Sequence, residues 1–252
     1  MLDLARNAVS VLLLVYACVQ DLKSREIDDR TWRALFVSAV ALNSIGVLVG
    51  TVDAVAWLTL ATLQSLAFWA LYRLGAYGGA DADCLMCLSF LYPTTFDLLT
   101  KGLNAAGFTT AVSTFDNAIV LSLIYVPLNL LENTGLMLRG VNVYEGLEQE
   151  SVLRRVGALF LLRKTSLSEL SVDGEKFVPA ERLDDQGSRH IAFYNNVNDA
   201  QPTGSQARGS NYEFATPLMP LLLYILMGFL VAKLYGDILL SLSQSLLRLV
   251  TG

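Results

Sequence analysis

Two aspartates beside apolar segments are the residues of this chain best placed to do chemistry. Asp21 follows an apolar run near the start of the sequence, and Asp81 follows the stretch Gly78-Gly79-Ala80 after another such run. Carboxylates in or beside hydrocarbon are energetically unfavourable, so each is a candidate functional group. Two carboxylates that lie close together resist double ionisation and tend to share one proton. One of them can then accept a proton from water while the other donates to a peptide group.

The residues next to Asp81 suggest how a substrate would reach it. Gly78 and Gly79 permit unusual backbone angles and let a substrate backbone approach closely. Asp83 forms an Asp-x-Asp pair with Asp81, and such pairs can hold Mg²⁺ together with substrate phosphates. A solvated or helix-capping role is the simpler interpretation of Asp83. Asp21 also has a simpler interpretation, as a helix cap or as an ion-pair partner of a nearby base.

The cysteines and the histidine give little support to a metal site. Cys84 and Cys87 have a spacing typical of metal or redox sites. The chain has only three cysteines and one histidine, His190, so a second ligand pair is missing and a packed helical pair is the favoured interpretation. Cys18 also lies in an apolar run, which makes a disulfide framework unlikely. We therefore expect no metal and no cofactor.

The composition is that of a membrane protein that crosses the bilayer several times. Of the 252 residues, 54% are hydrophobic and only 16% are charged, against about 25% charged in a typical soluble domain. The formal net charge of -5 argues against nucleic acid as a partner.

Apolar runs predict the elements that must position the two aspartates. A helix needs about 20 apolar residues to cross the hydrocarbon, and six runs approach this length, with the fourth clearly shorter than the others. The runs cover residues 4–19, 32–49, 55–74, 84–91, 118–131 and 218–234, and an amphipathic tail at 238–250 extends the last one. The predicted fold class is an all-α polytopic membrane protein with about six transmembrane helices.

A polar block interrupts the apolar pattern before the last run. Residues 145–161 have helical spacing, and residues 160–177 indicate strands around the turn signal Val172-Asp173-Gly174. Residues 195–212 are rich in Asn, Gly, Ser and Gln and are typical of a linker. We expect a small α+β insert. The predicted domains are therefore a transmembrane core at 1–138, the insert at 139–213, and the last span with its tail at 214–252.

The distribution of basic residues predicts the orientation. The loop after the first run carries four bases, the loop at residues 50–54 carries none, and Arg73 closes the third run. The positive-inside rule then places Asp21, Asp81 and the insert at the cytoplasmic face of the plasma membrane. Because two crossings separate the aspartates, both return to the same face.

The sequence resembles the archaeal preflagellin and type IV prepilin peptidases. The similarity lies in "VQDLKSREIDDRTW", in "GGADADCL" and in "ATPLMPLLL" before the last run. These proteins are membrane aspartic proteases of the GxGD type. The resemblance implies that Asp21 and Asp81 are catalytic and that Gly78, with Ala80 as its apolar position, belongs to the motif. One departure is Asp83, where family members often carry Lys.

The resemblance also implies the substrate. Family members remove a short basic leader from preflagellins, type IV prepilins or similar secreted proteins. Asp28 and Asp29 would attract such a leader, although both could simply cap the next helix. The residues predicted to bind substrate are Gly78, Gly79, Ala80, Asp28, Asp29 and Pro217. Pro217 and Pro220 are also expected to begin the last helix, with Thr216 as its cap and Pro217 in its first turn.

Two alternatives remain open. One is a Mg²⁺-dependent membrane transferase that acts on a lipid phosphate through Asp81 and Asp83. The other is a membrane scaffold without enzymatic activity, in which the acids are structural. The preferred hypothesis is an aspartic endopeptidase in the bilayer, with water as nucleophile.

Overall fold

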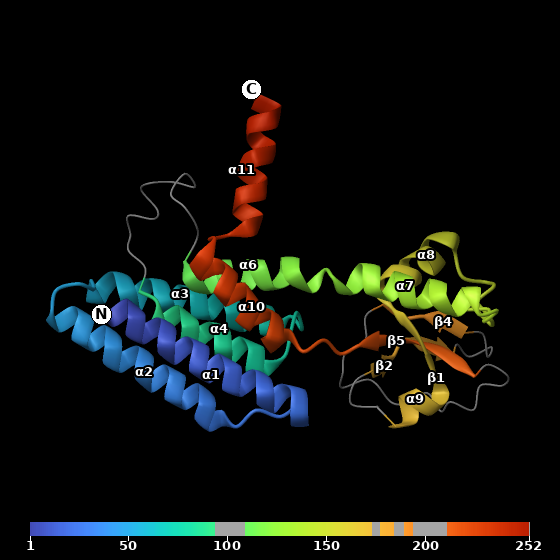
Figure 1. Ribbon diagram of the computed structural model, residues 1–252, viewed down its shortest axis with the longest axis horizontal. Coiled ribbons are helices and arrows are strands. Elements are labelled where there is room, and N and C mark those ends of the chain that lie inside the picture. The colour runs from blue at the N-terminus through green and yellow to red at the C-terminus, as the bar shows by residue number, and fades with distance from the viewer. Residues whose placement is uncertain (94–108, 173–176, 184–188, 194–210, 252) are drawn as a thin grey trace. The chain divides into compact units, whose positions relative to one another are not determined.

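The computed structural model describes residues 1–93, 109–172, 177–183, 189–193 and 211–251 (Figure 1). The chain divides into two compact units, which are described separately. The helical unit comprises Met1–Ser122 and Pro220–Gly252, and the mixed unit comprises Leu123–Met219. The predicted domain boundaries at 138/139 and 213/214 stay a prediction.

The helical unit is a bundle of apolar helices. Its helices are α1 (Leu2–Ser24), α2 (Asp29–Leu48), α3 (Ala54–Arg73), α4 (Gly79–Leu91), α6 (Thr110–Ser122), α10 (Leu221–Leu234) and α11 (Ile238–Thr251). In Figure 1 the first four run side by side with α6 and α10. Asp28 and Asp53 cap α2 and α3 by accepting hydrogen bonds from Arg30 N and Ala56 N, which satisfies backbone donors that helix starts leave free.

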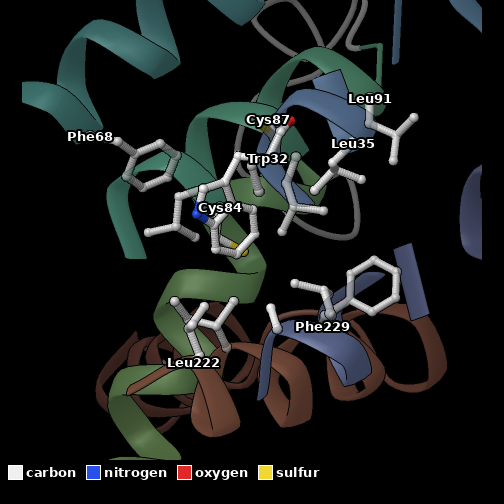
Figure 2. Close-up of a cluster of buried hydrophobic side chains, with 14 of the residues drawn as sticks. Trp32, Leu35, Phe68, Cys84, Cys87, Leu91, Leu222 and Phe229 are labelled. Atoms are coloured by element: carbon white, nitrogen blue, oxygen red, sulfur yellow. Dashed lines mark hydrogen bonds between the residues drawn. The ribbon is translucent and has the colours of Figure 1, made fainter. Parts of the chain in front are cut away.

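Helix α4 lies at the centre of this bundle and packs against α2, α3, α6 and α10. It buries residues on almost every side, as expected of a helix that is apolar all round. Figure 2 shows its Cys84, Cys87 and Leu91 among side chains from the neighbouring helices. The two cysteines are therefore part of the hydrophobic core.

Gly228 allows a close contact between α6 and α10. A Cβ added at Gly228 would lie 2.4 Å from the backbone oxygen of Thr114 and 2.7 Å from Ala118 N. Only a residue without a side chain fits there, and α10 can pack directly on the backbone of α6.

The structure supports fewer spans than the six predicted. Within the described part of the chain, four helices are long and apolar enough to cross a membrane, namely Leu2–Ser24, Asp29–Leu48, Ala54–Arg73 and Thr110–Leu138. A fifth results if α10 and α11, which are bent by 57°, count as one span. Helix α4 has 13 residues, or about 20 Å at 1.5 Å per residue, less than the roughly 30 Å of hydrocarbon. The fourth predicted run is thus a helix, but too short to cross alone.

The mixed unit combines short helices with two small sheets. Its elements are α7 (Tyr125–Leu138), α8 (Val152–Leu161), β1 (Arg163–Ser166), α9 (Leu167–Val172), β2 (Phe177–Pro179), β3 (Glu181–Leu183), β4 (Arg189–Ile191) and β5 (Tyr212–Pro217). One antiparallel sheet has the order β1-β5-β2, and β3 pairs with β4. In the combined span Thr110–Leu138, α7 follows α6 after a turn at residues 123–124, because Pro127 has no N–H to donate to the carbonyl of Leu123.

Several local predictions for this region need correction. Strands do occur near the signal Val172-Asp173-Gly174, but α9 separates them, and β1 and β2 pair with β5 instead of with each other. Residues 173–176 lie outside the described part of the chain. The predicted helical stretch at 145–161 forms a helix only from Val152 onward. Most of the predicted linker also lies outside the described residues, but Tyr212 at its end begins β5.

The start of the last helix was predicted wrongly. Thr216 and Pro217 end strand β5, where they pair with Val178 and Phe177, and α10 begins at Leu221 with Pro220 as its N-cap. The partner strand explains the difference, because a proline at a strand end costs no ladder hydrogen bond in the strand interior. Pro220, rather than Pro217, stands at the helix start.

Candidate active site

Asp21 lies in the last turn of α1 and is half-buried. The chain leaves the helix directly after it, because Arg25 at the C-cap adopts a left-handed backbone with φ of 55° and donates its N–H to Asp21 O. Non-glycine residues rarely adopt this conformation. The Arg25 charge acts on the Asp21 carboxylate. Among the described residues, Asp21 forms no ion pair within 4 Å.

Asp81 lies in the first turn of α4 and is also half-buried. Its Oδ2 accepts a hydrogen bond from Gly78 N at 3.2 Å, so the N3 carboxylate caps the backbone at the helix start. This contact fixes the carboxylate beside the backbone. Asp83, by contrast, is exposed and takes no part in the cap.

The glycines before Asp81 act differently from the prediction. Gly78 has an extended backbone, φ -76° and ψ 163°, and neither Gly78 nor Gly79 adopts a positive φ. The expectation of unusual backbone angles is therefore wrong. A Cβ at Gly78 would lie 3.2 Å from Asp81 Oδ2, so this glycine leaves room for the carboxylate. The predicted contacts of Gly78, Gly79 and Ala80 with substrate stay a prediction.

The structure brings the two aspartates of separate helices within electrostatic reach of one another. The charge of Asp21 acts on Asp81, and both charges act on Cys18, one turn before Asp21. The Cys18 thiol donates to Leu222 O at 3.3 Å, so the start of α10 packs beside this part of α1.

Tyr77 holds the backbone that leads into Asp81. Its hydroxyl donates to Phe68 O at 2.7 Å, and its ring packs edge-on against Phe115 at 5.5 Å between centroids. Burial raises the pKa of Tyr77 to about 12, and the nearby Asp81 charge adds to the effect. The phenol is therefore a neutral donor at neutral pH. Sequence reasoning missed this residue, whose only signal was its position next to the glycines.

Polar side chains hold the other end of α4. Asn43 Nδ2 donates to Phe90 O at 2.6 Å, and Trp57 Nε1 donates to the same oxygen at 2.8 Å. The amide oxygen of Asn43 accepts from Arg6 Nη2 at 2.6 Å. These bonds satisfy carbonyls that a helix end leaves free. Both ends of the helix that carries Asp81 are thus fixed, and the asparagine inside an apolar run was a signal that could have been used.

The acidic residues near the site have structural partners as well. Asp28 caps α2, and Asp29 lies 3.7 Å from Arg33 in an ion pair. The charge of Asp29 also acts on Asp83. The capping interpretation of Asp28 is confirmed, whereas attraction of a basic leader by Asp28 and Asp29 stays a prediction. Pro217 lies in the mixed unit at the end of β5, and its contact with substrate also stays a prediction.

A second pair of acids was missed by sequence reasoning. Asp116 of α6 and Asp237, between α10 and α11, interact electrostatically. Asp237 Oδ1 accepts from Leu240 N at 2.9 Å and thereby caps α11. Asn117 Oδ1 accepts from Ile238 N at 2.9 Å. These contacts stabilise the break between α10 and α11, so we assign the pair a structural role.

Comparison with known proteins agrees with the geometry. Residues 8–127 match the model of the type IV leader peptidase family. This part of the chain belongs to the type IV leader peptidase family. The matched segment contains both Asp21 and Asp81. A search of curated proteins finds no match to the chain.

The family and the apolar helices together define a coarse function. The protein is a multi-pass membrane peptidase, because the family match overlaps four candidate spans of the described residues. The family implies prepilin-like substrates.

Proposed function

We propose that the protein is an aspartic endopeptidase in which Asp21 and Asp81 form the catalytic pair. The observation that carries the proposal is the position of these two half-buried carboxyl groups, one in the last turn of α1 and one in the first turn of α4, within the segment that matches the leader peptidase family. One carboxyl group carries the shared proton and donates it to the scissile carbonyl, while the other accepts a proton from the attacking water. The hydrogen bond from Gly78 N holds one oxygen of Asp81 in place.

The proposed substrates are preflagellins, type IV prepilins or similar secreted proteins with a short basic leader. The negative charges of Asp28, Asp29 and Asp83 lie on the chain segments next to the pair and favour a cationic leader. The proposed site of cleavage is the cytoplasmic face of the plasma membrane, where the basic loop after α1 lies according to the positive-inside rule. Archaeal flagellin processing is the proposed context.

Carboxylate variants test this proposal. Asp21→Asn and Asp81→Asn should each abolish leader cleavage in detergent, scored as a mobility shift of a preflagellin, because an amide cannot share the proton. Asp83→Asn is the matched control and should keep most of its activity. Near-normal cleavage by either Asp21→Asn or Asp81→Asn would rule out that residue as a member of the catalytic pair.

A chelator and a pH series separate the proposal from metal chemistry. Activity should survive EDTA and should decline at alkaline pH as the pair loses its shared proton. An EDTA-killed reaction that Mg²⁺ restores, together with an inactive Asp83→Asn, would favour the transferase alternative.

A further inference from the structure

Helix α8 carries an apolar face that the described residues of the mixed unit leave exposed. At 100° per residue, Val152, Leu153, Val156 and Phe160 fall within an arc of about 100°. Leu153 is 82% exposed and Val152 is 68% exposed, and the other two are exposed as well. Single exposed apolar residues are common, but four on one face of a short helix indicate an interaction site.

The opposite face of α8 is firmly packed. Ala158 is fully buried in the core of the mixed unit. Asn133 of α7 donates to Leu159 O at 3.0 Å and to Leu162 O at 2.8 Å, and Asn129 donates to Phe160 O. The helix is therefore fixed in orientation, and its free face cannot turn into the core of its own unit.

The neighbour of α8 indicates what covers that face. Helix α7, against which α8 packs, is the second half of the candidate span Thr110–Leu138. It also exposes Leu128, Leu131 and Leu138. A helix that packs against the end of a membrane span lies next to the lipid headgroups. We therefore take lipid, rather than a protein partner, as the occupant of this face.

Charge agrees with a lipid surface. Arg139 follows the last residue of α7 and is exposed, whereas Arg154 of α8 points away from the apolar face and is held by Glu150 and Ile191 O. Amphipathic helices in the membrane interface place apolar residues in the acyl boundary and bases near the phosphates.

We propose that α8 lies in the headgroup region of the bilayer, with Val152, Leu153, Val156 and Phe160 facing the acyl chains. The mixed unit is then attached to the membrane at two elements, α7 and α8. This inference does not depend on the peptidase proposal, since it rests on α8 and on the candidate span that includes α7.

A fluorescence experiment tests the proposal on the full chain. Leu153→Cys and Gln149→Cys are each labelled with the environment-sensitive dye NBD and reconstituted in phosphatidylcholine/phosphatidylglycerol nanodiscs. Gln149 is exposed and precedes the helix, so it is the matched control. The wild-type chain, labelled in parallel, corrects for its three buried cysteines. Val156→Cys is a second probe of the same face.

The expected result is a difference in quenching between the two positions. The dye at position 153 should be blue-shifted and quenched several-fold more by lipids with a nitroxide near the headgroup, and that at 149 more by aqueous iodide. Equal iodide quenching at 149, 153 and 156 would overturn the proposal. Protection that appears only in discs with two copies of the chain would also overturn it, because the face would then bind a second copy.

Discussion

The two units of the protein treat buried acids in different ways. In the mixed unit, Glu181 is buried and accepts from Lys164 Nζ at 2.9 Å and from Phe214 N at 2.6 Å, and it also pairs with Arg189. In the helical unit, Asp81 is held only by the Gly78 N–H, and no ion pair of Asp81 occurs among the described residues. Full pairing makes an acid structural, whereas an acid that lacks a base keeps a proton available for chemistry.

Buried Glu150 of the mixed unit repeats the paired pattern. It accepts from Ile191 N at 2.8 Å and lies 3.4 Å from Arg154 Nε. Burial lowers the pKa of Lys164, and the charge of Glu181 counteracts this effect. The charges of this unit thus stabilise one another. If one partner is removed, the remaining charges stay buried without compensation, which destabilises the fold.

The largest expected effect on stability comes from a substitution of Glu181, the fully paired acid. Glu181→Gln leaves the buried Lys164 ammonium without its carboxylate, which should destabilise the mixed unit by about 3 to 5 kcal/mol. Asp81→Asn, which keeps an oxygen acceptor for Gly78 N, should change stability by less than about 1 kcal/mol and yet abolish cleavage. Hydrogen–deuterium exchange, read separately on peptides of each unit, measures both changes. Equal protection in the two variants would contradict the contrast.

Substitutions of Gly228 and Gly135 compare how tightly the helices of the two units are packed. Gly228→Ala places a methyl group against the backbone of Thr114 and should destabilise the α6–α10 contact by about 1 to 3 kcal/mol. Gly135→Ala in α7 meets nothing within 4 Å, and should stabilise its helix by about 0.5 to 1 kcal/mol. Exchange rates in α6 and α7 report the two effects. If Gly228→Ala left the exchange rates in α6 unchanged, the two helices could separate slightly without a loss of stability, and this prediction would be wrong.

Much of the helical unit follows from its sequence, and the reasons for the exceptions are physical. The apolar runs at 4–19, 32–49 and 55–74 correspond to α1, α2 and α3, because hydrophobic length suffices to predict a buried or membrane helix. Pro93 keeps Tyr92 extended and so ends α4 at Leu91, but the partners of Phe90 O, Asn43 and Trp57, lie 47 and 33 positions away in the chain. Local patterns carry no information about such partners.

The strands and the candidate site show the same limit. Strands β2 and β3 have three residues each, too few for a recognisable alternation. The pairing of β5 with β1 and β2 overrode the helix-start signal of Thr216-Pro217. Asp21 and Asp81 could be named from motif and topology, but the roles of Tyr77 and Gly78 depend on atoms that only the fold brings together.

Glu213 tests the mixed unit by pH. Burial raises its pKa from 4.5 to about 7, with the charge of Glu181 adding to the effect and Arg189 and Lys164 opposing it. The stability from protonated Glu213 is fully present below about pH 4.5 and is lost as pH rises through 7. After allowance for solvent screening we expect a loss of about 1 kcal/mol. In exchange measurements Glu213→Gln should flatten the wild-type decline between these values, and an identical pH profile would refute the assignment.

The smallest expected effect concerns Tyr77. Tyr77→Phe keeps the ring contact with Phe115 but removes the hydrogen bond to Phe68 O, worth about 0.5 to 1.5 kcal/mol. Because the loop then holds Asp81 less firmly, kcat should fall several-fold while KM stays near the wild-type value. Phe36→Leu, which alters a ring pair with Phe90 elsewhere in the bundle, is the control. A rise in KM alone would argue against a positioning role.

The anchoring of α4 has a consequence for the order of assembly during synthesis. Arg6, Asn43 and Trp57, which together hold the carbonyl end of α4, all precede that helix in the chain. When Phe90 leaves the ribosome, its hydrogen-bond partners have already been made. A nascent chain truncated after α4 thus contains all the residues that hydrogen-bond the end of α4. A chain that lacks α2 would leave Phe90 O without the Asn43 donor.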